Sequence, residues 1–246
     1  MNAGNLSEWL STPTGQYVQD WERAQLDSAV EDIFGFNAVQ IGLPEFDCLQ
    51  ANRIPLRFCV GEAQSAAILC DPNALPLASQ SIDLVVLPHV LEFSDTPHQI
   101  LREAERVLRP EGQIIISGFN PLSFWGLKRM LRGARAGYPW CGNFIGLLRL
   151  RDWLKLLGFE LNGGRFGCYA PPFSKATWLQ RFAFMEKAGD RWWPIAGGLY
   201  VVRAVKRVQG MRMVMPGWKN GKAPVKRLAP VARREPSLRK TGTHDS

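Results

Sequence analysis

The chain has 246 residues, of which 46% are hydrophobic and 21% are charged, enough for one sizeable core with length left over for appendages. Its formal net charge is +8, and no apolar run reaches the roughly 18 residues that a membrane-spanning helix needs. Because the first residues also lack the basic start and apolar centre of a signal peptide, we expect a cytoplasmic protein without a transmembrane segment.

Residues 1–34 are predicted to be helical, because their large apolar side chains recur at roughly helical spacing. Five short runs rich in Val, Ile, Leu and Phe follow, and they do not alternate with polar residues. Such runs are typical of strands buried on both faces, as in a parallel sheet. The five runs are FNAVQIGL (36–43), PLRFCVG (55–61), AAILCD (66–71), IDLVVLPHV (82–90) and GQIIISGF (112–119).

The run TPHQILREAERVLRPEG predicts a helix between the last two strands, because its apolar residues share one face. Asp95 and Thr96 offer a capping signal at its start, and Pro97 suits the first turn. Pro110 and Gly112 end it. A helix between two buried strands indicates an α/β layer fold.

An aromatic and basic insert at 120–147 precedes a second amphipathic helix that ends at Gly158 and a final strand pair. We interpret the insert as a lid helix with a solvated face. A lid over an apolar substrate and a helix lying on an anionic membrane surface are the alternatives. The predicted organisation is an N-terminal helical segment (1–34), an α/β domain (35–207) and a tail (208–246).

The tail carries the basic charge of the chain. From Arg203 onward there are 12 Lys or Arg and 2 Asp or Glu, whereas residues 1–202 contain 18 basic and 20 acidic residues. This composition predicts a disordered segment that makes, at most, weak contacts with nucleic acid or an anionic surface.

The five cysteines form no CxxC pair and no set with histidines. They are Cys48, Cys59, Cys70, Cys141 and Cys168. This pattern favours reduced, mostly buried thiols, and no metal site is expected.

A series of short motifs between residues 71 and 112 resembles the central part of the class I S-adenosylmethionine-dependent methyltransferases, of the group called type 11. The motif residues are Asp71, Ala74, Leu75, Pro76, Ser81, Asp83, Leu91, Glu92, Leu101, Glu103, Arg106, Val107, Leu108, Pro110 and Gly112. The resemblance extends more weakly over residues 36–207. It implies a Rossmann-like, seven-stranded, mostly parallel sheet flanked by helices, with S-adenosylmethionine bound across the carboxyl ends of the first strands.

The resemblance also implies a role for several residues. Asp71 would accept a hydrogen bond from the adenine amino group, with Ala74 and Leu75 beside the ring, although an Asx turn is the alternative role for this aspartate. Glu62 is the candidate for the ribose hydroxyls. Pro88 would border the cofactor at the end of the fourth strand.

The loop after the first strand departs from the family pattern of an acidic residue followed by three alternating glycines. Gln40 stands at the acidic position and Gly42 at the first glycine, while Pro44 and Phe46 replace the other two. Gly42 and Leu43 are the residues predicted to contact the cofactor here. Proline removes an amide donor, and phenylalanine adds bulk where close approach is needed.

His89 is the candidate catalytic residue, as a general base or as a group that orients the substrate. The sequence therefore predicts a methyltransferase that acts on a small or lipid-like acceptor. A non-catalytic module that keeps the fold with an eroded cofactor site is the alternative, and a nucleic-acid modifier is a third hypothesis that rests on the tail charge alone.

Overall fold

A computed structural model describes residues 3–133, 137–172 and 195–207, together with residues 181, 182, 185, 186, 189, 191 and 193. The described strands form one seven-stranded sheet in the order β3-β2-β1-β4-β5-β7-β6. Their bounds are β1 Asn37–Ile41, β2 Leu56–Gly61, β3 Ile68–Leu69, β4 Ile82–Pro88, β5 Leu108–Phe119, β6 Phe159–Gly167 and β7 Leu199–Lys206. Strands β1 to β5 pair in parallel, and β7 runs antiparallel to both of its neighbours. The predicted seven-stranded, mostly parallel α/β sheet is confirmed.

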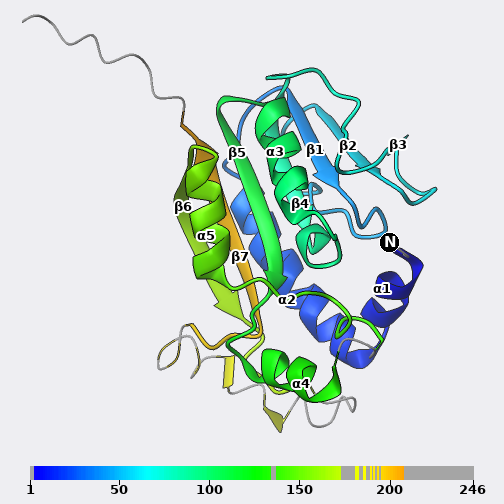
Figure 1. Cartoon of the computed structure of the whole chain (residues 1–246), viewed down its shortest axis with the longest axis vertical. Coiled ribbons are helices and arrows are strands. Elements are labelled where there is room, and N and C mark those ends of the chain that lie inside the picture. The colour runs from blue at the N-terminus through cyan, green and yellow to red at the C-terminus, as the bar shows by residue number, and fades with distance from the viewer. Residues whose placement is uncertain are drawn as a thin grey trace, which may run out of the picture. The chain divides into compact units, whose positions relative to one another are not determined.

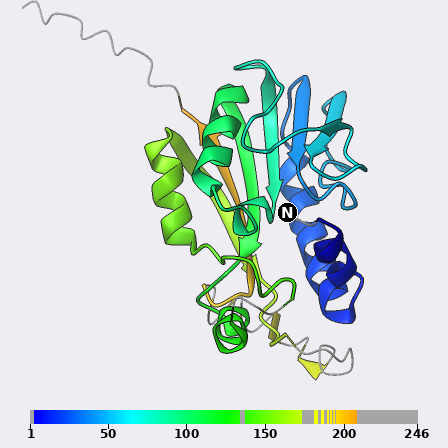
Figure 2. The ribbon, with the colours of Figure 1, turned by 45° about the vertical axis from the view of Figure 1, so that its right-hand side comes forward.

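Helices cover both faces of this sheet (Figures 1 and 2). The described helices are α1 Ala3–Leu10, α2 Pro13–Val30, the short 3-10 helix η1 Val90–Glu92, α3 Pro97–Val107, α4 Phe124–Arg132 and α5 Leu147–Leu156. Helices α3 and α5 bury their apolar residues against one face, whereas α2 packs on the other through Leu26 and Val30. None of the helices in the described part of the chain is both long and apolar enough to cross a bilayer.

The N-terminal segment is two helices rather than one. Pro13 begins α2, and the side chain of Thr12 caps it by accepting a hydrogen bond from the amide of Gly15. A Cβ atom on Gly15 would come within 2.3 Å of the carbonyl oxygen of Trp9, so only glycine permits this close corner. The chain therefore turns sharply between α1 and α2.

The start of α3 is predicted correctly at Pro97, but the expected capping hydrogen bond is wrong. Thr96 occupies the N-cap position and its side chain makes no cap. Its hydroxyl donates instead to the side chain of Asn73, 2.8 Å away, in the loop that follows β3. A tertiary contact thus replaces the local one.

Two motifs of the central region tie neighbouring elements together. The carboxylate of Asp83, in β4, accepts hydrogen bonds from the amides of Phe36 and Asn37 at 2.7 and 3.0 Å, where β1 begins. In α3, Glu103 accepts from the amide of Leu75, and Arg106 donates to the carbonyl oxygens of Leu75 and Leu77. These ties fix β1 and the loop after β3, two of the segments that surround the site.

Candidate cofactor site

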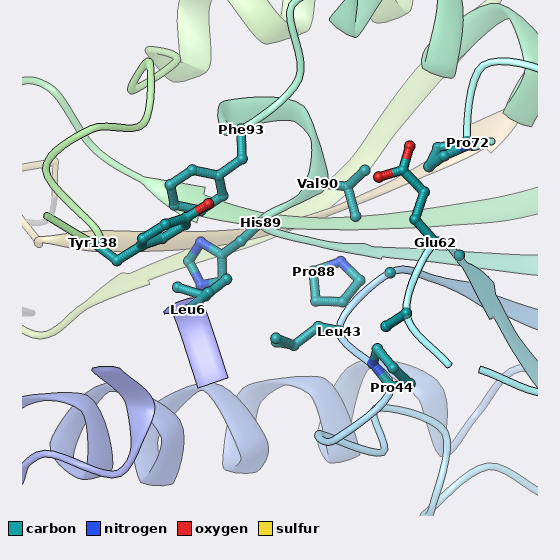
Figure 3. Close-up of a pocket in the computed structure, with 13 residues that line it drawn as sticks. Leu6, Leu43, Pro44, Glu62, Pro72, Pro88, His89, Val90, Phe93 and Tyr138 are labelled. Atoms are coloured by element: carbon teal, nitrogen blue, oxygen red, sulfur yellow. The ribbon is translucent and has the colours of Figure 1, made fainter. Parts of the chain in front are cut away.

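A cavity of about 60 Å³ lies beyond the carboxyl ends of β1, β2 and β4 (Figure 3). In an open α/β sheet this is the edge at which ligands bind. The lining residues are Leu6, Gly42, Leu43, Pro44, Gly61, Glu62, Ala63, Pro72, Pro88, His89, Val90, Phe93 and Tyr138. Five of the residues predicted to bind the cofactor or to act in catalysis therefore meet here, and they come from three different strand ends.

Two glycines bring the backbones of β1 and β2 close together at the cavity. Gly42 has φ +77°, and a Cβ atom on it would come within 2.8 Å of a methyl group of Val90. A Cβ atom on Gly61 would contact the Cα atom of Gly42 at 3.4 Å. The predicted close approach at Gly42 is thus built into the strand ends themselves.

The loop after β1 is closed upon itself by the buried side chain of Gln40. Its amide nitrogen lies 3.0, 2.9 and 2.8 Å from the carbonyl oxygens of Gly42, Leu43 and Phe46, and its amide oxygen accepts from the amide of Cys48 at 2.8 Å. Leu43, within this loop, adopts the left-handed conformation, with φ +48°. A glutamine at this position satisfies the carbonyl groups that a carboxylate would repel.

Phe46 lies outside the cavity. Its ring is 1% exposed and packs in the core between the sheet and α2, with the guanidinium of Arg23 4.8 Å from the ring centroid. The bulk that replaces glycine here therefore fills the α2 side of the molecule. Pro44, by contrast, lines the cavity.

The residues proposed for the ribose and adenine separate in the structure. Glu62 follows β2 and borders the cavity, opposite Phe93 and Tyr138 in Figure 3. Asp71 is exposed, is absent from the lining, and accepts hydrogen bonds from the amide and side chain of Asn73 as an Asx turn. Ala74 is exposed and Leu75 belongs to the core. Glu62 thus faces the cavity, and the roles of Asp71, Ala74 and Leu75 stay predictions.

His89 lines the cavity, yet both of its ring nitrogens contact buried carboxylates. Nδ1 lies 2.8 Å from Glu92, and Nε2 lies 3.2 Å from Glu22 of α2; all three side chains are 1% exposed. Burial lowers the pKa of the imidazole, but the two carboxylates outweigh it and raise the pKa to about 10. The ring is therefore an imidazolium at neutral pH, which suits positioning rather than proton abstraction.

Glu22 and Glu92 complete a buried charge cluster that the sequence did not indicate. Glu92 also accepts a hydrogen bond from the amide of Phe119, and burial raises its pKa above the usual value. Glu22 occupies the same helical stripe as Val18, Leu26 and Val30, which are fully buried. A glutamate within an apolar stripe is the signal that could have identified it.

A second, more polar cavity of about 470 Å³ adjoins the first, and the two share Phe93 and Tyr138. The centroids of these two rings are 5.0 Å apart. The second cavity is also lined by His98, Arg149 and Trp153 of α3 and α5, with the Arg149 guanidinium 5.1 Å from the Trp153 ring centroid. An aromatic pair thus borders both spaces.

The small volume of the first cavity is the main difference between this cavity and a formed ligand site. Ligand pockets commonly measure roughly 300–1,000 Å³, whereas this cavity measures about 60 Å³. Its residue types nevertheless suit the ribose end of a nucleoside cofactor, because Glu62 can accept from two vicinal hydroxyls and the strand glycines admit close approach. The lining fits such a cofactor in kind, and the volume accommodates only part of one.

Comparison with known proteins identifies the family. The family described as "Methyltransferase domain" matches residues 46–116. The chain is 35% identical to the uncharacterized protein YafS of Escherichia coli (strain K12) over 162 residues, 64% of this chain and 67% of YafS. It is 33% identical to the malonyl-[acyl-carrier protein] O-methyltransferase of Laribacter hongkongensis over 98 residues, 39% of this chain and 33% of that enzyme.

A solved structure agrees at the level of the fold. A SAM-dependent methyltransferase from Thermotoga maritima superposes with a TM-score of 0.58 at 18% identity, covering 78% of this chain and 92% of that one. The chain belongs to the class I S-adenosylmethionine-dependent methyltransferases, and the resemblance seen in the sequence is confirmed.

Proposed function

We propose that this protein binds S-adenosylmethionine at the cavity beyond β1, β2 and β4 and transfers its methyl group to a small or lipid-like acceptor. Family membership and the position of the cavity support this function. The observation that carries it is the convergence of Gly42, Gly61 and Glu62, since close backbone approach and a carboxylate at adjacent strand ends are what a nucleoside cofactor requires.

Binding of the whole cofactor requires the cavity to widen. Leu6 and Tyr138 line it from α1 and from the segment before α5, outside the central sheet. Because these two side chains do not belong to the strands, their withdrawal leaves the sheet unchanged. We infer that the free protein holds the smaller cavity, and that Leu6 and Tyr138 withdraw to admit the cofactor and then close over it.

The acceptor is proposed to enter from the second cavity, past Phe93 and Tyr138. The cofactor supplies an electrophilic methyl group, and the reaction needs alignment more than acid or base power. His89, held by two carboxylates, positions the end of β4 between the cavities. The relative that methylates malonyl-acyl carrier protein is consistent with an acceptor carrying an anionic group near Arg149.

Calorimetry with S-adenosylhomocysteine tests the cofactor site. We expect the wild type to bind, Glu62→Ala to weaken binding at least ten-fold, and Glu45→Ala to change it less than two-fold. Glu45 is an exposed carboxylate on the neighbouring loop that does not line the cavity, so it is a matched control. Equal weakening by both variants would remove Glu62 from the site.

A non-catalytic module is the second candidate function, and the volume of the first cavity is the observation that favours it. In that case the self-closed Gln40 loop and the aromatic pair are permanent features. The wild type would then give no heat with millimolar S-adenosylhomocysteine. Detectable saturable binding would exclude this candidate.

A further inference from the structure

Helix α4 directs its apolar side chains outward, away from the body of the protein. It lies at the end of the molecule in Figures 1 and 2, beyond the sheet. Its inner side is anchored by Trp125, which is fully buried and donates to the carbonyl oxygen of Ala170 at 3.1 Å. The outward residues are Leu122, Phe124, Leu127, Met130 and Leu131, with 70%, 52%, 49%, 72% and 77% of their surface exposed.

These side chains form one continuous apolar surface rather than a set of separately exposed residues. With 3.6 residues per turn, Phe124, Leu127 and Leu131 share one stripe and Met130 adjoins it. Five large apolar side chains within ten residues exceed the isolated exposures that any soluble surface shows. Because Trp125 fixes which side of α4 faces the protein, the fold itself determines that the apolar side chains on the other side face outward.

Cations lie along one edge of the apolar stripe. Arg132 is exposed, and Lys128 donates to the carbonyl oxygen of Pro172 while its ammonium lies 4.9 Å from the ring centroid of Trp140. Lys128 and Arg132 also line a cavity of about 330 Å³ with Trp9, Tyr138 and Trp140.

The charge of the residues around α4 indicates which kind of partner fits this surface. Residues 112–151 contain six Lys or Arg and no Asp or Glu, although residues 1–202 as a whole are slightly acidic. A second copy of this surface would bring like charges together. An apolar stripe with cations along one edge is complementary to a bilayer with anionic headgroups, where the stripe reaches the acyl boundary.

We propose that α4 docks the protein on the surface of membranes rich in anionic phospholipid. Leu127 and Leu131 enter the acyl boundary, and Lys128 with Arg132 contacts headgroup phosphates. This inference is independent of the methyl-transfer proposal, because α4 contributes no residue to the first cavity.

Flotation of the full chain with phosphatidylcholine vesicles, with and without 30% phosphatidylglycerol, tests the proposal. We expect binding to the anionic vesicles and a loss of at least ten-fold in partition coefficient for Leu127→Ser with Leu131→Ser. The matched control is Leu148→Ser with Leu156→Ser, because these leucines of α5 are 64% and 86% exposed. The control should bind like the wild type, and both variants should keep the wild-type melting temperature.

Three results would overturn the proposal. In the first, the wild type binds neither vesicle. In the second, the α4 variant binds anionic vesicles as well as the wild type, which would assign the attraction to the basic tail alone. In the third, sedimentation shows a wild-type dimer that the α4 variant dissociates, which would assign the surface to a second copy of the chain.

Discussion

Replacing His89 by glutamine removes the only cation that the described structure places between two buried carboxylates. Glu22 and Glu92 contact the two ring nitrogens at 3.2 and 2.8 Å, and both are 1% exposed. A pKa raised from 6.5 to about 10 corresponds to roughly 5 kcal/mol of preference for the protonated ring. Removing one partner of a buried ion pair typically costs about 3–5 kcal/mol. The value from the pKa shift and the value expected for a buried ion pair therefore agree.

The pH dependence has a definite sign. In the wild type, a folded pKa above the unfolded one means that the contribution is complete below about pH 6.5 and lost as the pH rises toward 10. In His89→Gln the buried carboxylate of Glu92, whose pKa burial raises, destabilises the fold as the pH rises and it ionises. The difference between the two proteins should therefore be largest near pH 7 and smaller at both pH 5 and pH 10.

Urea denaturation at pH 5, 7 and 10 measures these differences. We expect His89→Gln to lose about 4 kcal/mol at pH 7, which corresponds to roughly 8–16 °C in melting temperature for a domain of this size. Adding Glu22→Gln should restore part of the loss, because one buried charge fewer is left unpaired. His98→Gln is the control, since His98 is exposed. A loss that is absent, or that stays constant from pH 5 to 10, would refute a charged cluster.

Three further changes test the ties around the site. Gln40→Glu sets a carboxylate against three carbonyl oxygens, so urea denaturation should show a loss of about 3 kcal/mol; unchanged stability would contradict the observed loop. Asp83→Ala removes an acceptor from the amide of Phe36 and should cost about 2 kcal/mol. Burial raises the pKa of the Asp83 carboxyl, but the amides of Phe36 and Asn37 outweigh it and hold that pKa below its usual value. The cost of Asp83→Ala should therefore vanish as the pH falls below this lowered pKa. Arg106→Lys loses the guanidinium hydrogen bond to the carbonyl oxygen of Leu75. Calorimetry should show a melting temperature lower by a few degrees. An unchanged melting temperature would show that this hydrogen bond is dispensable for stability.

The central strands were predictable because they are buried on both faces and so have continuous apolar runs. Strand β3 shows the limit of this signal: its run spans 66–71, but only Ile68–Leu69 pairs, at the exposed edge of the sheet. Pairing at an edge depends on the neighbouring strand, which a run of apolar residues does not encode.

The site was less predictable, because its contacts join residues far apart in the chain. Gly42 and Glu62 were predicted from the family resemblance, and their places after two parallel strands bring both to the same edge of the sheet. Glu22 could not be paired with His89, 67 residues later, without the packing of α2 on the sheet. The Asx turn at Asp71 was among the local alternatives, and the choice between the two roles depends on which way the loop faces.

Two of the three departures from the family pattern, Gln40 and Phe46, act on the opposite side of the loop from the cavity, whereas Pro44 lines it. Gln40 bonds the carbonyl groups of the loop, and Phe46 packs in the core against α2. These two replacements therefore serve the docking of the N-terminal helices, which in turn bring Glu22 to His89. Gly42 keeps its positive φ and its close approach to Val90 on the cavity side. Because the loop presents different residues to each side, the replacements at Gln40 and Phe46 leave the cavity side of the loop to Gly42, Leu43 and Pro44.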